Sequence, residues 1–252
     1  MARRRHGVHR KRFGGWNLIW KFATLALVVA AVVMALILFF RVENIRIEGE
    51  EHYSEQEILQ ASGLEKGDNM YLLNKAKAAD RVTGTLPYVR NVRINRELPS
   101  TLVIEVRESP VAGVLITAEG DWVLNAEGKI MEAREPAGVY ENAVIDGVTL
   151  KDPVVGKKAE TDEDSSYRFE EMLRLLQELE TKGLLDKVQA IHLGESDMMT
   201  MEYENRFVVC LPWGADYEYK LRGLESVIDE LEINETGTID MLREDGEVHF
   251  YP

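Results

Sequence analysis

Residues of the types that catalyse reactions are few in this chain, and their spacing matches no catalytic signature. Beyond a long apolar run the histidines are His52, His192 and His249, which lie far apart in the sequence. No serine is followed three residues later by lysine, which excludes the signature of penicillin-binding transpeptidases. Gly-x-Ser-x-Gly, His-Glu-x-x-His and Gly-x-Gly phosphate loops are absent as well. The sequence therefore indicates no catalytic residue and no bound cofactor.

An acidic run and a single cysteine are the remaining candidates for chemistry. The run 160–164 lacks the alternating ligands of an EF-hand and the glutamate at its twelfth position. It suits the start of a helix instead, where carboxylates face the positive end of the helix dipole. Cys210 lies in the apolar run 207–211, which favours a small core residue in a buried strand over a reactive thiol. We expect no metal site, and one cysteine allows no intramolecular disulfide.

The chain is organised around residues 22–40, a run without a charged residue. As a helix it would be roughly 28 Å long, close to the ~30 Å hydrocarbon core of a bilayer. A fully buried core helix is one alternative. A cleaved signal peptide is another, but no Ala-x-Ala site follows, and the run ends in Phe39, Phe40 and Arg41. We therefore predict a transmembrane helix at 22–40 that stays in the mature protein.

Charge is divided sharply on the two sides of this run. Residues 1–21 hold seven of the 30 basic residues and none of the 44 acidic ones, so the tail carries +7 and the rest −21. Basic flanks stay in the cytoplasm, which predicts a type II protein of the cytoplasmic membrane with an extracytoplasmic C-terminal region. A basic tail also suits nucleic acid or anionic lipid, but topology explains it sufficiently. We expect no nucleic-acid partner.

The residues after the run predict a strand, two helices and two further strands. Ser54 and Glu57 form a capping box, and Gly63 is placed to end the helix that follows. Asn74 is placed to cap a second helix, which Pro87 ends. Strands are predicted at 41–48, 91–95 and 101–108, where Leu102, Ile104 and Val106 alternate with polar residues in the last one. Two helices would then cover one face of a three-stranded sheet and leave the other wet.

This order resembles the POTRA domain of exported bacterial proteins. The resemblance lies in 42–49, 54–64, 67–70, 87–89 and 98–110. A basic tail, one span and a single POTRA domain are similar to the FtsQ/DivIB family of cell-division proteins. The expected fold class is thus a membrane-anchored α+β protein with a tail at 1–21, a span at 22–40, a POTRA domain at 41–110 and a second α+β domain at 111–252.

The pattern of 111–252 predicts more strands than helices. A hairpin at 120–132, which also fits the family, is followed by a short strand at 144–145. Strands are expected at 188–193, 198–203 and 207–211, and a closing hairpin from 237–242 and 247–251. Amphipathic helices are expected around Phe169 to Leu179, ending at Gly183, and from Tyr217 to Leu231.

The resemblance implies a non-enzymatic scaffold that joins FtsL-like and FtsB/DivIC-like single-span partners and links them to septal wall synthesis. The alternative is a membrane-anchored extracytoplasmic enzyme or export chaperone that uses a POTRA module. In the family FtsB/DivIC docks at the membrane-distal end of the second domain. A terminal strand that no other strand covers is paired on one side only. The backbone N–H and C=O groups on its other side can then pair with a strand of another protein. The predicted partner-binding strand consists of Glu247, Val248, His249, Phe250 and Tyr251. The alternative is an ordinary paired strand whose last residues fray.

Overall fold

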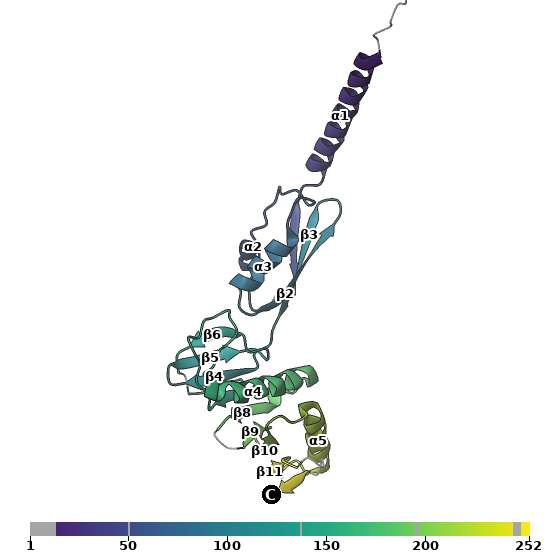
Figure 1. Cartoon of the computed structure of the whole chain (residues 1–252). Helices are drawn as coiled ribbons and strands as arrows, with labels where there is room; N and C mark the ends of the chain where they lie inside the picture. The colour runs from purple at the N-terminus through teal and green to yellow at the C-terminus, as the bar shows by residue number, and fades with distance from the viewer. Residues whose placement is uncertain (1–13, 50, 137, 195–196, 244–247) are drawn as a thin grey trace, which may run out of the picture.

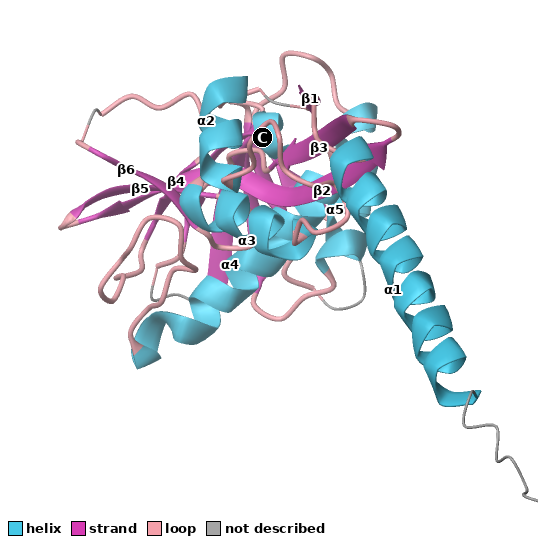
Figure 2. Cartoon of the chain, turned by 90° about the horizontal axis from the view of Figure 1, so that it is seen from above, coloured by secondary structure: helices cyan, strands magenta, loops and turns pink. Residues whose placement is uncertain are grey.

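A helix and two α+β units follow one another from one end of this protein to the other (Figure 1). The computed structural model describes residues 14–49, 51–136, 138–194, 197–243 and 248–252. The helix α1 (Gly14–Phe39) contains most of the predicted span and projects away from both units (Figures 1 and 2). In the part of the chain that is described, no helix combines the length and the apolarity needed to cross a membrane. The predicted transmembrane helix is thus not confirmed, and the basic tail up to residue 13 lies outside the described residues.

The first unit, the three-stranded unit, has the predicted order of elements. Its sheet runs β1-β3-β2, with β1 parallel and β2 antiparallel to the central β3. Ser54 and Glu57 form the predicted capping box, Gly63 ends the first helix at a φ of 63°, and Asn74 caps the second. The elements are β1 (Asn44–Glu48), α2 (Glu55–Ser62), α3 (Lys75–Thr85), β2 (Val89–Glu97) and β3 (Thr101–Glu108).

The core of this unit lies between the sheet and its two helices. Leu102, Ile104 and Val106 of β3 are buried there together with Ile58 of α2 and Val82 of α3. The opposite face of the sheet carries exposed or half-exposed polar and charged residues, apart from the buried Val103. The strand register and the position of the helices are therefore as predicted.

The second unit, the nine-stranded unit, is built on one mixed sheet. Among the described residues its strand order is β12-β11-β10-β9-β8-β7-β4-β5-β6. No sequence pattern predicted β4, which pairs with β5 and, in parallel, with β7. The strands are β4 (Gly113–Thr117), β5 (Gly120–Leu124), β6 (Ile130–Arg134), β7 (Val144–Asp146), β8 (Val188–His192), β9 (Met198–Tyr203), β10 (Phe207–Pro212), β11 (Gly237–Asp240) and β12 (His249–Tyr251).

Two α-helices, α4 (Glu163–Lys182) and α5 (Tyr217–Glu230), pack on this sheet, and a short 3-10 turn, η1 (Leu185–Lys187), follows α4. Asp162 of the acidic run caps α4 by accepting from the Ser165 amide, and Gly183 ends the helix. Leu176 and Leu179 of α4 and Leu221 and Leu224 of α5 are fully buried in the core. The acidic run is thus a helix start, as predicted.

An apolar cluster joins the two units. Tyr88, which precedes β2, is buried with Val114, Val123 and Met131 of the nine-stranded unit. The Tyr88 hydroxyl donates to the Glu132 carboxylate at 2.9 Å. Burial and then this carboxylate raise the pKa of Tyr88 from its ordinary 10.0 to about 12. The phenol therefore stays neutral and keeps donating at any physiological pH.

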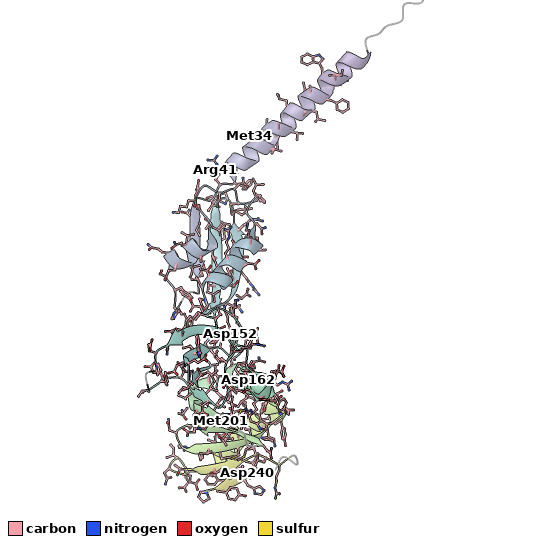
Figure 3. All side chains as sticks on the ribbon, turned by 60° about the vertical axis from the view of Figure 1, so that its left-hand side comes forward. Met34, Arg41, Asp152, Asp162, Met201 and Asp240 are labelled. Carbon is pink, nitrogen blue, oxygen red and sulfur yellow. The ribbon has the colours of Figure 1, made fainter. Side chains whose placement is uncertain are left out.

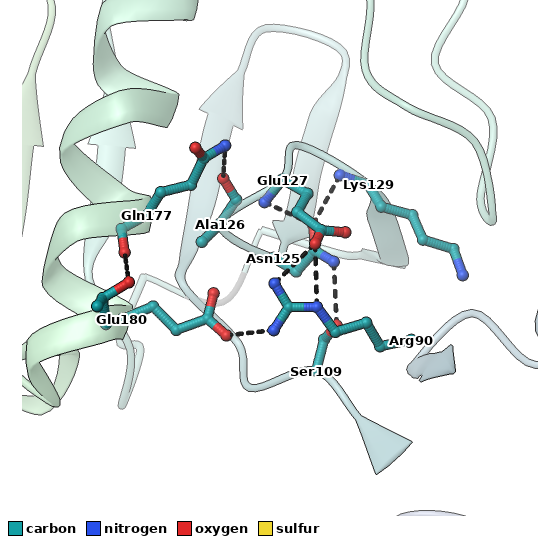
Figure 4. Close-up of polar contacts among 9 residues, drawn as sticks. Arg90, Ser109, Asn125, Ala126, Glu127, Lys129, Gln177 and Glu180 are labelled. Atoms are coloured by element: carbon teal, nitrogen blue, oxygen red, sulfur yellow. Dashed lines mark hydrogen bonds and ion pairs between the residues drawn. The ribbon is translucent and has the colours of Figure 1, made fainter. Parts of the chain in front are cut away.

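Ionic contacts flank this cluster (Figure 4). Arg90 of β2 donates to Glu127 through Nε and Nη2, at 3.0 and 2.7 Å, and to Glu180 of α4 through Nη1, at 2.7 Å. Lys129 Nζ lies 3.4 and 3.3 Å from the carbonyl oxygens of Thr83 and Val89 in the other unit. These contacts tie β2 to both the β5–β6 hairpin and α4, so they set the orientation of the units.

Candidate partner-binding edge

The nine-stranded sheet has two edges, and only one of them is covered by other residues of the described chain. At the β6 edge, Glu132 binds Tyr88 of the other unit, while Ile130 exchanges backbone hydrogen bonds with Gly156 and Lys157. At the other edge, β12 pairs with β11 and with no second strand among the residues described. Asp240 marks this end of the molecule, and Arg41 marks the junction with α1 (Figure 3). The open edge therefore lies far from α1.

The side chains of β12 alternate between the two faces of the sheet. Phe250 and the preceding Val248 pack against the core, and the Phe250 ring meets that of Phe207 edge-on at 6.1 Å. His249 and Tyr251 lie on the other face, with ring centroids 6.4 Å apart. Glu247, the first residue of the predicted binding strand, lies outside the described residues.

The backbone of β12 is oriented by its register with β11. Thr238, Ile239 and Asp240 face Tyr251, Phe250 and His249 in turn. The Tyr251 carbonyl oxygen points toward β11, so closely that a Cβ on Gly237 would overlap it. Backbone groups alternate in direction along a strand, so the N–H and C=O of Phe250 point to the open edge. Phe250 thus combines a core side chain with an outward backbone donor and acceptor.

A buried lysine, which the sequence did not single out, supports this edge from behind. Lys220 of α5 is only 7% exposed. Its ammonium group donates to the carbonyl oxygens of Met241, at 2.8 Å, and Arg243, at 2.6 Å. Met241 and Arg243 follow β11 in the chain, so Lys220 fixes the backbone of residues 241–243 directly after that strand. The only sequence signal was a lysine on the apolar stripe of the predicted helix.

A shallow groove of about 210 Å³ runs between α5 and the end of β11. Met241, Val248 and Gly223 are among the residues that line it. Tyr219, at the groove, is 53% exposed. The groove extends the apolar surface beside the open edge, so an added strand would find side-chain contacts as well as backbone partners.

The described histidines, His52, His192 and His249, do not assemble with Cys210 into a reactive site. His52 stacks on Tyr88 at the junction of the units, at a centroid distance of 3.8 Å, whereas His192 Nδ1 meets Asp146 at 2.9 Å on the sheet. His249 lies at the β12 edge. Cys210 is buried, and burial raises the pKa of its thiol. Across the described residues, no group of three or more His, Cys, Asp or Glu side chains is arranged to hold a metal ion.

Both units match known protein families. Residues 40–109 match the family described as POTRA domain, FtsQ-type, and residues 114–242 match the family described as Cell division protein FtsQ/DivIB, C-terminal. The two matches begin and end close to the limits of the three-stranded unit and of most of the nine-stranded unit.

Similar proteins carry names from cell division. The chain is 25% identical over 206 residues to the cell division protein DivIB of Clostridium acetobutylicum, which covers 81% of this chain and 80% of that protein. It is 26% identical over 227 residues to FtsQ of Syntrophotalea carbinolica, covering 87% and 78%. FtsQ of Corynebacterium glutamicum is 31% identical over 119 residues, covering 45% and 53%.

Proposed function

Because the chain belongs to the FtsQ/DivIB family of cell-division proteins, we propose that it is a non-catalytic scaffold of the division machinery. On the outer side of the cytoplasmic membrane it would join FtsL-like and FtsB/DivIC-like single-span proteins and link them to septal cell-wall synthesis. Its parts are a cytoplasmic tail at 1–21, an anchor at 22–40, a POTRA domain at 41–110 and a partner-binding domain at 111–252.

The open β12 edge is the observation that carries this proposal. It presents the backbone donor and acceptor of Phe250 at the end of the molecule opposite α1. A single-span partner could add a strand there while its own helix lies in the same membrane as α1. Strand addition binds mainly through main-chain hydrogen bonds and therefore suits a scaffold without a catalytic centre.

The anchor in this proposal is α1. Its described side chains from residue 19 to residue 35 are all exposed, among them Leu25 at 59% and Leu27 at 72%, and residues 22–40 carry no charge. Apolar side chains exposed in this way support a lipid environment for α1, although its described part alone does not combine the length and the apolarity needed to cross a bilayer. A reporter enzyme that works only outside the cytoplasm, fused after Pro252, should be active while the full-length protein stays in washed membranes. An inactive reporter would contradict the type II topology.

Localisation tests the cellular role. A fluorescent protein fused to the N-terminus of the full chain should form a band at midcell in dividing cells. A uniform envelope signal would instead favour the alternative of an enzyme or chaperone that uses a POTRA domain.

Backbone variants test the edge. Phe250→Pro and Phe250→Ala both remove the contact with Phe207, but only proline also removes the outward N–H. Proline is tolerated on an edge strand whose N–H faces solvent, so both variants should fold with similar melting temperatures. Binding of the extracytoplasmic part of the FtsB/DivIC-like partner should be weakened roughly two- to tenfold more by proline, since one lost hydrogen bond is worth ~0.5–1.5 kcal/mol. Equal binding by the two variants would rule out strand addition at this residue.

A further inference from the structure

The end of the three-stranded unit next to α1 carries exposed apolar side chains on two loops. Leu72, in the loop between α2 and α3, is 75% exposed, and Leu98, in the turn between β2 and β3, is 62% exposed. Tyr71 beside Leu72 is 54% exposed. We call residues 69–73 and 98–100 the tip loops. Apolar side chains that gather on one end of a domain, rather than singly over its surface, indicate a contact surface.

Both tip loops are tied to the residues that directly follow α1. The Met70 amide donates to the Phe40 carbonyl at 2.9 Å, and the Glu43 amide donates to the Ser100 carbonyl at 2.8 Å. Leu72 and Leu98 are each two residues from these bonds, so they lie within ~7 Å of them along an extended chain. Both tip loops therefore lie close to residues 40–43, the segment that follows the end of α1 at Phe39.

The connection between α1 and the unit is short and packed. Phe40 packs against the core of the three-stranded unit, and its ring meets Tyr71 edge-on at 5.0 Å. The Arg96 guanidinium in turn lies over the Tyr71 ring, 5.4 Å from its centroid. The first residue after α1 is therefore already part of the folded unit, and the tip loops are held at a fixed place relative to the helix end.

The charged groups at this end are compatible with a lipid surface. Arg41 and Lys66 are exposed here, and an exposed cation beside apolar side chains suits the headgroup layer. Of the nearby acidic residues, Glu43 accepts from the Ser100 hydroxyl at 2.9 Å, Asp68 accepts from the Glu65 amide at 3.1 Å, and Glu97, beside Leu98, pairs with Arg46 at 2.7 Å. Glu65 is exposed beside Lys66.

We propose that the tip loops lie in the headgroup layer on the side of the bilayer where α1 ends. The side chains of Leu72 and Leu98 would be inserted into this layer. The inference rests on the proposed function, because it requires α1 to be the anchor. A headgroup layer is roughly 5–8 Å thick on each side of the hydrocarbon core, which matches the reach of the tip loops from the helix end. Two apolar contacts with the bilayer beside the anchoring helix would restrict rotation of the two folded units about residue 40.

Fluorescent labels on the full chain test this contact. In a Cys210→Ala background, a single environment-sensitive label is attached through Leu72→Cys, Leu98→Cys or, as a matched control, Ile233→Cys. Ile233 is 90% exposed and follows α5 in the nine-stranded unit. Each chain is reconstituted in nanodiscs of phosphatidylethanolamine and phosphatidylglycerol, with and without a lipid that carries a nitroxide quencher at its headgroup. The labels at 72 and 98 should shift to the blue and lose emission to the quencher, whereas the label at 233 should do neither.

The outcomes separate the anchor from the contact. If the chain does not enter nanodiscs, the proposed anchor fails before the tip loops are tested, and the inference falls with it. If the chain is anchored and all three labels behave alike, the tip loops make no specific contact with the bilayer and the inference is overturned. Adding Leu72→Asp to the chain labelled at 98 should reduce quenching while the melting temperature stays unchanged, because Leu72 is exposed and the label itself is the same. Unchanged quenching would mean that the attached label itself, and not the apolar side chains of the loop, causes the contact with lipid. That result would also contradict the inference.

Discussion

Arg90 offers the sharpest test of how the two units are held together. Arg90→Gln keeps a polar but shorter side chain and removes the charge that faces Glu127 and Glu180. The pair with Glu127 is half exposed, with side-chain exposures of 40% and 49%, and such pairs contribute ~0.2–1 kcal/mol. Glu180 is only 19% exposed, so its pair with Arg90 is less screened by solvent. We therefore expect Arg90→Gln to lower the free energy of unfolding by about 1–2 kcal/mol.

The matched control is Arg46, which also meets two carboxylates. Its partners, Glu48 and Glu97, lie within the three-stranded unit and all three side chains are more than half exposed. Arg46→Gln should cost less than about 1 kcal/mol and should leave the orientation of the units unchanged. Thermal unfolding measures the first difference, at about 2–4 °C per kcal/mol for a chain of this size. Small-angle X-ray scattering measures the second, as a broader distribution of end-to-end distances for Arg90→Gln alone.

Two results would contradict this account. The first is an effect of Arg90→Gln no larger than that of Arg46→Gln. The second is an effect that persists unchanged in 1 M salt, where the screening length falls to ~3 Å. Either would mean that the apolar cluster around Tyr88 holds the units together without help from the ion pairs.

Two further predictions concern the core and the junction. Ile104→Asp should cost several kcal/mol because it places an unpaired carboxylate at a fully buried position, whereas Glu105→Lys on the wet face should cost about 1 or less; equal shifts in melting temperature would mean that the strand register is wrong. At the junction, hydrogen bonds from Arg134 lower the pKa of Glu132 below its ordinary 4.5, and the Tyr88 hydroxyl lowers it further. The stabilisation is present above pH 4.5 and is lost as the pH falls through the lowered value, so Glu132→Gln should flatten this acid limb in calorimetric scans, and an unchanged acid limb would contradict the assignment.

The three-stranded unit was predictable because its signals are local. Ser54 and Glu57 are three residues apart, and the alternation of Leu102, Ile104 and Val106 is visible in one strand. The strand β4 was missed for the opposite reason. Its first three residues, Gly113, Val114 and Leu115, are all buried, so the strand has no alternation to reveal it.

What the sequence could not give depends on distant contacts. Arg90 meets partners 37 and 90 residues further along the chain, and no spacing rule connects them. The strand order that inserts β7 between β4 and β8 likewise depends on parallel pairing across long connections. At the candidate edge the faces of Val248 and His249 followed from alternation, but the direction of the Phe250 backbone required the register with β11.

The order of the strands also determines how the protein would carry a mechanical load. From β6 to β11 the strands follow one another down the long axis of the molecule (Figure 1). Tension between α1 and a partner at β12 would therefore run across the sheet, along its inter-strand hydrogen bonds. It must cross β7, which is joined to β4 by two residue pairs and to β8 by three. Under force the sheet should part first at β7, leaving β8 to β12 paired and still attached to the partner.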